Sequence, residues 1–328
     1  MVKVDSALLR RFAYWGARHG PRAFVEHSPR AIGMLFALAL PGVRRRVLEN
    51  LRRVFGQRSG LAEQYDVLRT FMNYAACLAE GLGTERMEAR RVKFHAEGAE
   101  HLESALSADR GLILLTAHIG PFEAAARYFS QVHHVNLMVV MNKEPNPAAR
   151  QFHDDLRRKM GVVVTHVGEH PLDALPVLGH LERGGVAAIQ LDRLSGNGRN
   201  LDAKFFGGTW PIPEGPLRLA SLCEVPLMTV FTRRRAYFDY ELVMSELMHV
   251  GRRPSRPELE AHAQKLAAGL ERAILRDPTQ WFHFARGEAA GEPRQSLSQS
   301  RSSLGTRGLS STSQAADERR VAGTRRPF

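Results

Sequence analysis

From residue 111 onward, short apolar runs alternate with longer amphipathic stretches along the chain. The apolar runs are rich in Val, Ile and Leu, and they predict buried strands at residues 112–117, 136–141, 162–165, 186–191, 225–231 and 237–243. The stretches between them predict helices at residues 122–129, 147–160, 172–182 and 215–223. Such alternation is typical of a mostly parallel sheet covered on both faces. We therefore predict an α/β fold for residues 111–286, with a mostly parallel central sheet flanked by helices.

The chain before residue 111 has mainly helical periodicity. Phe71, Tyr74 and Leu78, for example, recur at the spacing of one helix face. Helices are predicted at residues 1–30 (with a break at Gly20-Pro21), 43–55, 61–82 and 99–107, a short strand at 91–94, and a further amphipathic helix at 257–276. We accordingly divide this part into an N-terminal helical segment, residues 1–60, and a helical lead-in, residues 61–110.

The last forty residues have a different composition from the rest. Residues 287–328 are rich in Ser, Arg, Gly and Gln, and Leu304 and Leu309 stand isolated among polar neighbours. Such a segment has too little apolar surface to form a core, so we predict a disordered tail.

Positive charge is concentrated at the N-terminus. The chain has a net charge of +12, and residues 1–60 hold twelve Lys and Arg against three acidic residues. The apolar run at residues 31–40 is too short to cross a membrane, which takes about 20 residues, and Arg44-Arg45-Arg46 follow it. An apolar patch beside a basic cluster is typical of an interfacial membrane anchor. An ordinary core helix with a solvated charged face is the alternative, and the pattern alone favours neither.

Candidate chemistry lies where the strand at residues 112–117 gives way to a helix. His118 follows the strand, Gly120-Pro121 ends it, and Glu123 falls in the first turn of the next helix. Across such a junction the two side chains can converge. A carboxylate beside an imidazole fixes its tautomer and stabilises the imidazolium, as in a general base that activates a hydroxyl. The alternative is a strand-end His with an unrelated Glu that is favoured by the helix dipole.

Several motifs resemble one enzyme family. His118 to Glu123 is similar to the H-x-x-x-x-D/E motif of glycerolipid-type acyltransferases. The wider chain, over residues 30–286, resembles the bacterial lipid A biosynthesis (lauroyl/myristoyl) acyltransferases. The further segments that carry this resemblance are Gln190-Leu191-Asp192-Arg193, Phe205-Phe206-Gly207, Pro213-Glu214-Gly215-Pro216 and Pro278-x-Gln280-Trp281.

The resemblance implies an O-acyltransferase. A fatty acyl thioester, on acyl carrier protein or coenzyme A, would react with a hydroxyl of a glycolipid or lipid A-type acceptor. His118 would act as the base, Glu123 would orient it, and positive charge with the helix N-terminus near residues 120–123 would stabilise the oxyanion. No cofactor or metal is implied. The resemblance also favours attachment to an anionic membrane surface, at the cytoplasmic face of the inner membrane, as a peripheral or monotopic protein.

Further residues are candidates for substrate binding. Asp192 stands where the family has an acid, and Lys143 stands near the position where the family tends to have an Arg. The other candidates, which include glycines that allow close backbone approach and cations that suit phosphates, are Gly120, Arg193, Lys204, Gly215 and Arg218. Solvated charges and turn residues are the plainer interpretation of each.

Other function classes lack their anchor residues. The chain has no G-x-S-x-G elbow, no phosphate-binding G-x-x-x-x-G-K, and only two cysteines, without a CxxC pair. The basic ends lack the aromatic interleaving typical of nucleic-acid binding, so we expect no nucleic-acid partner. A non-catalytic peripheral membrane or scaffold protein with an acyltransferase-like fold remains the alternative.

Overall fold

The computed structural model describes residues 14–17, 19–83, 92–108, 110–143, 146–159, 161–168, 170–193 and 198–284. These residues belong to one compact unit. The predicted tail, residues 287–328, lies outside them.

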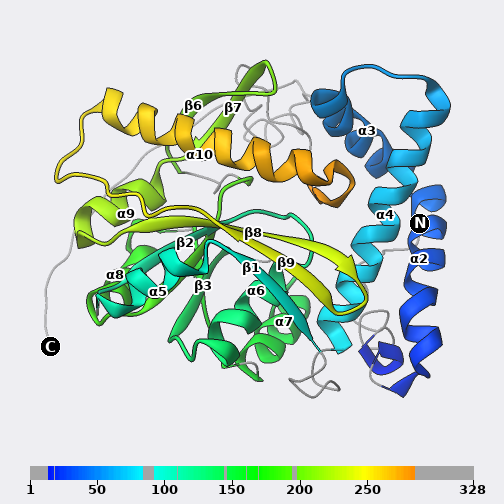
Figure 1. Ribbon diagram of the computed structural model, residues 1–328, viewed down its shortest axis with the longest axis horizontal. Coiled ribbons are helices and arrows are strands. Elements are labelled where there is room, and N and C mark those ends of the chain that lie inside the picture. Colours follow the sequence, from blue (N-terminus) through cyan, green and yellow to red (C-terminus); the bar gives the residue numbers. More distant parts are fainter. Residues whose placement is uncertain are drawn as a thin grey trace, which may run out of the picture. The chain divides into compact units, whose positions relative to one another are not determined.

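Seven strands form the central sheet, in the order β1-β9-β8-β2-β5-β3-β4 (Figure 1). Their bounds are β1 Lys93–Glu97, β2 Leu112–Thr116, β3 Leu137–Asn142, β4 Val163–Val167, β5 Val186–Gln190, β8 Leu227–Ala236 and β9 Asp239–Met244. Neighbouring strands are parallel except β8 and β9, which are joined as an antiparallel hairpin. The predicted α/β fold with a mostly parallel sheet is confirmed.

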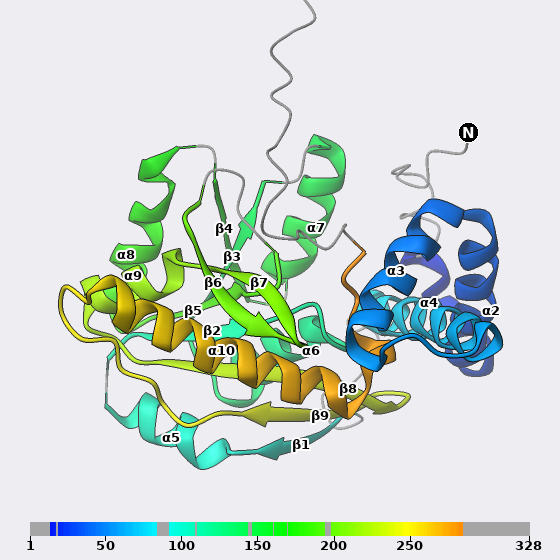
Figure 2. The same cartoon turned by 90° about the horizontal axis from the view of Figure 1, so that it is seen from above.

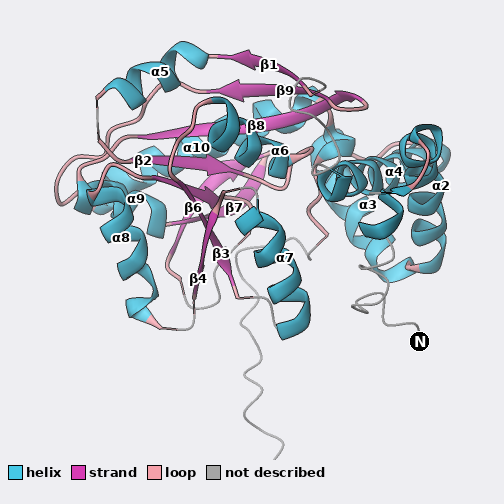
Figure 3. Cartoon of the chain, turned by 90° about the horizontal axis from the view of Figure 1, so that it is seen from below, coloured by secondary structure: helices cyan, strands magenta, loops and turns pink. Residues whose placement is uncertain are grey.

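Helices cover both faces of this sheet (Figure 3). The core helices are α5 Ala99–Ser107, α6 Phe122–Arg127 continued by the π-helical turn η3 Tyr128–Val132, α7 Pro147–Lys159, η4 Pro171–Ala174 with α8 Leu175–Glu182, α9 Gly215–Cys223 and α10 Arg256–Arg276, followed by the 3₁₀ turn η5 Pro278–Gln280. The N-terminal helices are α2 Arg22–Ala39, α3 Pro41–Phe55 and α4 Gly60–Gly83.

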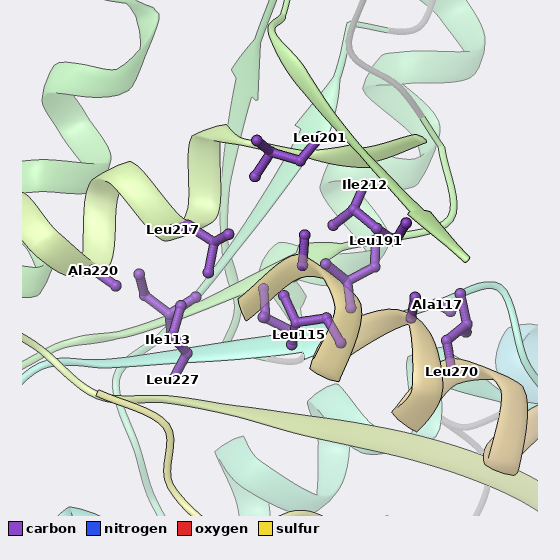
Figure 4. Close-up of a cluster of buried hydrophobic side chains, with 14 of the residues drawn as sticks. Ile113, Leu115, Ala117, Leu191, Leu201, Ile212, Leu217, Ala220, Leu227 and Leu270 are labelled. Atoms are coloured by element: carbon purple, nitrogen blue, oxygen red, sulfur yellow. The ribbon is translucent and has the colours of Figure 1, made fainter. Parts of the chain in front are cut away.

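The side chains of β2 divide between two hydrophobic cores, because successive residues of a strand point to opposite faces. Ile113 and Leu115 pack into one cluster with residues from α8, α9 and α10 (Figure 4). Leu112 and Leu114 pack into a second cluster with residues from α5 and α6. A strand buried on both faces needs the continuous apolar sequence that β2 has, and this fixes its place in the middle of the sheet.

A second, two-stranded sheet is absent from our sequence predictions. It is the antiparallel hairpin β6 Asn200–Phe205 and β7 Gly208–Pro213. Phe206 and Gly207 form its turn with positive φ angles of 46° and 73°, a geometry typical of tight hairpin turns. The hairpin lies against α10, where the Gln264 side chain pairs with the backbone of Lys204. The F-F-G segment is therefore a hairpin turn.

The N-terminal helices form a layer of their own (Figure 2). A third hydrophobic cluster draws Ala37 from α2, Val47 and Leu51 from α3, and Val67 and Phe71 from α4. This cluster crosses the boundary that we predicted at residue 60. None of the helices in the described part of the chain is both long enough and apolar enough to cross a membrane.

A buried ion pair ties this layer to the sheet. Glu80 of α4 accepts hydrogen bonds from Arg234 of β8 at 2.7 Å and from the Tyr240 hydroxyl of β9 at 2.8 Å. All three side chains are buried. Burial raises the pKa of Glu80, while Arg234 and Tyr240 favour its charged form. Removal of either partner would leave the other charge buried and unpaired, which strongly destabilises a fold.

Replacing Glu80 with Ala should therefore lower the free energy of unfolding by about 3–5 kcal/mol, because Arg234 would be left buried without its partner. Urea denaturation followed by circular dichroism measures this change. Glu260→Ala removes the exposed pair with Arg256 and should leave the midpoint nearly unchanged. Similar midpoints for the two variants would show that the Glu80 pair does not hold the layer to the sheet.

Candidate active site

The turn after β2 requires glycine at one position. Gly120 has a φ of +55°, and a Cβ atom there would lie 2.4 Å from the carbonyl oxygen of Thr232. Its backbone N–H donates to the carbonyl of Gln280 at 2.8 Å. Gly120, which we predicted to let the backbone approach the substrate, lines the cavity described below, and its N–H is occupied by this bond. Its role is to let the chain turn beside β8.

His118 and Asp192 meet because their strands are neighbours in register. β2 and β5 are parallel, and Thr116 lies opposite Gln190, so the residues two positions later emerge side by side. His118 Nδ1 and Asp192 Oδ1 are 2.8 Å apart, and the His118 backbone N–H donates to Oδ2 at 3.0 Å. The Asp192 side chain is fully buried. It therefore holds the imidazole in one orientation and leaves Nε2 for a substrate.

The charge state of this pair follows from its surroundings. Burial alone would raise the pKa of Asp192, but the charge of His118 and its hydrogen bonds outweigh burial and hold that pKa well below its usual value. Asp192 is thus an anion at neutral pH. An anion behind an imidazole stabilises the imidazolium that forms when the ring takes a proton.

Glu123 occupies a different position from the one we expected. We predicted that it would orient His118, and the structure gives that contact to Asp192. Glu123, in the first turn of α6, instead accepts a hydrogen bond from Arg157 of α7 at 2.7 Å. Its side chain is about one-third exposed, so it is far more open to solvent than Asp192. Proximity in sequence suggested the wrong carboxylate, because the strand neighbour supplies the buried one.

His118 and Glu123 open into the same cavity, which has a volume of about 380 Å³. One part of its wall is apolar and aromatic, and comes from α4 and the segment after η5: Tyr74, Cys77, Leu78, Phe282 and Phe284. Another part is charged or polar and comes from α7, β4 and the end of β5: Arg150, Asp154, Arg157, His166 and Arg193. The cavity therefore joins an acid–base pair to an apolar wall and a cationic one.

Sequence reasoning missed the two arginines of α7 that line the cavity, Arg150 and Arg157. Arg150, Asp154 and Arg157 are spaced by four and three residues, which places them on one face of the helix. This spacing is visible in the sequence, and it could have indicated a charged helix face. We proposed Lys143 for a cationic role, but it is exposed just after β3 and is not among the described residues that line the cavity.

The remaining predicted residues divide into two groups. Arg193 lines the cavity next to Asp192. Lys204, Gly215 and Arg218 are not among the described residues of the cavity wall. Lys204 belongs to the β6–β7 hairpin, Gly215 begins α9, and Arg218 pairs with Glu214 one helical turn earlier at 2.6 Å. These three residues therefore lie outside the described cavity wall, and their role in substrate binding stays a prediction.

Comparison with known proteins gives one family. The sequence profile described as "Bacterial lipid A biosynthesis acyltransferase" matches residues 6–287. The search of curated proteins finds no match. Among solved structures, the chain is similar to the 1-acyl-sn-glycerophosphate (LPA) acyltransferase PlsC from Thermotoga maritima, at 13% identity and a TM-score of 0.38, over 76% of this chain and 95% of that one.

The geometry of the pair predicts that Asp192→Asn lowers the rate of acyl transfer by about 10³–10⁴-fold, because an amide does not stabilise the imidazolium and can hold the wrong tautomer. Glu123→Gln, which retains a hydrogen-bond acceptor for Arg157, should cost clearly less. Initial rates with an acyl thioester donor and membranes, on variants with unchanged circular dichroism, measure both. A larger loss in Glu123→Gln would contradict the assignment of Asp192 as the partner of His118.

Proposed function

From the premise that the chain belongs to the bacterial lipid A biosynthesis acyltransferase family, and is therefore an acyltransferase, we propose that it transfers a fatty acyl group from a thioester to a hydroxyl. The donor would be acyl carrier protein or coenzyme A, and the acceptor a glycolipid or lipid A-type molecule. The observation that carries this proposal is the His118–Asp192 pair at the wall of a cavity that is apolar on one side and cationic on another.

In this proposal His118 is the general base. Its Nε2 takes the proton of the acceptor hydroxyl while the oxygen attacks the thioester carbonyl. The tetrahedral intermediate then expels the thiolate, which receives the same proton from the imidazolium, so that an ester and a free thiol are formed. Asp192 remains an anion throughout and stabilises the imidazolium. The acyl group passes directly between the substrates, with no covalent intermediate on the enzyme.

The cationic wall suits the charge that develops in this step. Arg150, Arg157 and Arg193 lie on the cavity that His118 opens into. Guanidinium groups bind carboxylate and phosphate oxygens through paired hydrogen bonds, and they stabilise an oxyanion in a site shielded from water. Glu123 pairs with Arg157 and would hold that side chain in place. These residues favour an acceptor or donor that carries phosphate groups.

The apolar wall suits the acyl chain. Helix α4 contributes Tyr74, Cys77 and Leu78 to the cavity, and it packs against α2. We place the acyl chain against this wall because an apolar chain is stabilised by about 0.8 kcal/mol per buried methylene group. Helix α4 would then lie between the substrate and the outer helix α2.

Helix α2 carries the surface that we propose for membrane attachment. Leu35 and Leu38 are about two-thirds exposed, and Ile32 and Phe24 are also exposed. Arg44 and Arg45 follow at the start of α3, so apolar and basic side chains adjoin. This combination supports an interfacial anchor in the region 1–60, at the cytoplasmic face of the inner membrane, with α4 in the lead-in and residues 111–286 as the catalytic core.

His118→Ala should reduce acyl transfer at least 10³-fold, because the hydroxyl proton would then have no acceptor at the reacting atoms. The assay is transfer of a labelled acyl group to lipid, with acyl carrier protein and coenzyme A thioesters as separate donors. His101→Ala, a partly exposed residue of α5, is the matched control and should retain full activity. Undiminished transfer by a folded His118→Ala protein would contradict the role of His118 as the base, whereas no transfer by the original protein would support the non-catalytic alternative.

Introducing charge into the apolar face of α2 should weaken membrane binding. Leu35→Glu with Leu38→Glu is expected to lower the partition coefficient onto vesicles rich in phosphatidylglycerol at least about 100-fold, since two leucines that insert into the membrane contribute about 1.5–3 kcal/mol each. Sedimentation of the vesicles measures it. Leu222→Glu, at an equally exposed leucine of α9, is the control. Equal binding of the original protein, the double variant and Leu222→Glu would exclude α2 as the anchor.

A further inference from the structure

The segment after α10 lies directly against the catalytic turn. The Gly120 N–H donates to the carbonyl of Gln280 at 2.8 Å, and the Phe282 N–H donates to the carbonyl of His118 at 2.7 Å. Between these bonds, Ile119 and Trp281 form an isolated antiparallel bridge. The backbone of His118 is thus paired on one side with a segment that is more than 160 residues away in the sequence.

Trp281 reaches from this segment to the buried carboxylate. Its indole Nε1–H donates to Asp192 Oδ2 at 3.2 Å, and the side chain is buried. The carboxylate therefore accepts from three donors: the His118 ring on Oδ1, and the His118 backbone and the Trp281 indole on Oδ2. The indole is the one donor to Asp192, among the described residues, that does not come from His118 itself.

His283 does not share this function. Its Nδ1 lies 4.0 Å from Asp192 Oδ2, beyond hydrogen-bond distance. Burial lowers the pKa of His283 to about 4, so the ring is neutral at pH 7. It stacks on Trp281 with a centroid distance of 5.4 Å. His283 therefore supports the indole by packing.

We propose that Trp281 is a positioning residue for acyl transfer: its indole N–H fixes the Asp192 carboxylate and thereby the orientation of the His118 ring. This inference rests on the proposed role of His118 as the base. The two bonds from His118 tie the carboxylate only to the residue that it has to orient, whereas the indole N–H ties Oδ2 to the segment after α10 and so limits rotation about the Cβ–Cγ bond. Trp281 is not among the described residues that line the cavity, so it acts through Asp192 and not on the substrate.

The chain offers a matched comparison for the simpler interpretation, in which Trp281 only fills the core. Trp210 of β7 is buried, and its ring lies 5.7 Å from that of Trp281. Its Nε1 has no hydrogen-bond partner in the part of the chain that the structure describes. Trp281→Phe removes a hydrogen bond to Asp192 together with some packing, whereas Trp210→Phe removes comparable packing with no hydrogen bond to Asp192 and keeps an aromatic ring under Arg53.

Steady-state kinetics separate the two interpretations. Trp281→Phe is expected to lower kcat by about tenfold with KM for donor and acceptor unchanged, because a hydrogen bond to a charged group is lost away from the substrate. Trp210→Phe should stay within about twofold of the original protein in both constants. Equal losses in the two variants, or an unchanged kcat in Trp281→Phe, would overturn the proposal.

Nuclear magnetic resonance tests the same contact without any turnover. The chain has three tryptophans, so ¹⁵N labelling gives three indole signals, and Trp281→Phe and Trp210→Phe assign two of them. Asp192→Asn should shift the Trp281 indole proton upfield, because a neutral amide is a weaker acceptor, and should move the Trp210 signal much less. A Trp281 signal that does not respond to Asp192→Asn overturns the proposal. If the original protein transfers no acyl group, the proposed function fails, yet this measurement still decides the contact.

Discussion

A fully buried carboxylate, that of Asp192, is the constraint on which the active site depends. An isolated carboxylate in such a place would lose its charge, because burial strongly disfavours the ionised form. Asp192 keeps its charge because three N–H donors surround it: the His118 ring, the His118 backbone and the Trp281 indole. Two of these donors belong to His118, so the same contacts that stabilise the anion also fix the histidine. The same hydrogen bonds therefore set both the charge of Asp192 and the orientation of the His118 ring.

Much of the fold could be predicted from the periodicity of the sequence, whereas the pairing of side chains could not. Apolar runs give the strands, and their ends place His118 and Asp192 at the carboxyl edge of a sheet. That β2 and β5 are neighbours in register is a fact of topology, and no local pattern contains it. Because we did not know the strand order, we chose the carboxylate nearest to His118 in sequence, Glu123, and assigned it the contact that Asp192 makes. The Arg150–Arg157 face of α7 was visible as a spacing, but the direction of that face depends on packing.

The motif around Phe205 shows that a family resemblance can locate residues without giving their structure. We predicted substrate binding for Lys204 and Arg218 as cations that suit phosphates, and for Gly215 as a glycine that allows close backbone approach. The segment is a hairpin turn, and the alternation of buried Leu201, Ala203 and Phe205 with exposed Asp202 and Lys204 was a strand signal that we did not use. Phe205 packs its ring 6.0 Å from Trp281. Phe205 thus packs beside the indole that donates to Asp192.

The N-terminal layer is bound to the same site by polar contacts from its inner side. Asn73 of α4 donates to the Thr279 hydroxyl at 2.9 Å, and Asn50 of α3 donates to the carbonyl of His283 at 2.6 Å. The segment after α10 is therefore held by the N-terminal helices on one side and by the backbone of His118 on the other. Helix α4 also forms part of the cavity wall, and its Glu80 neutralises buried Arg234. Without this layer, buried Arg234 would lose its partner Glu80, and the cavity would lose the part of its apolar wall that α4 supplies. Helix α4, against which α2 packs, is thus both a part of the cavity wall and a support of the segment that pairs with His118.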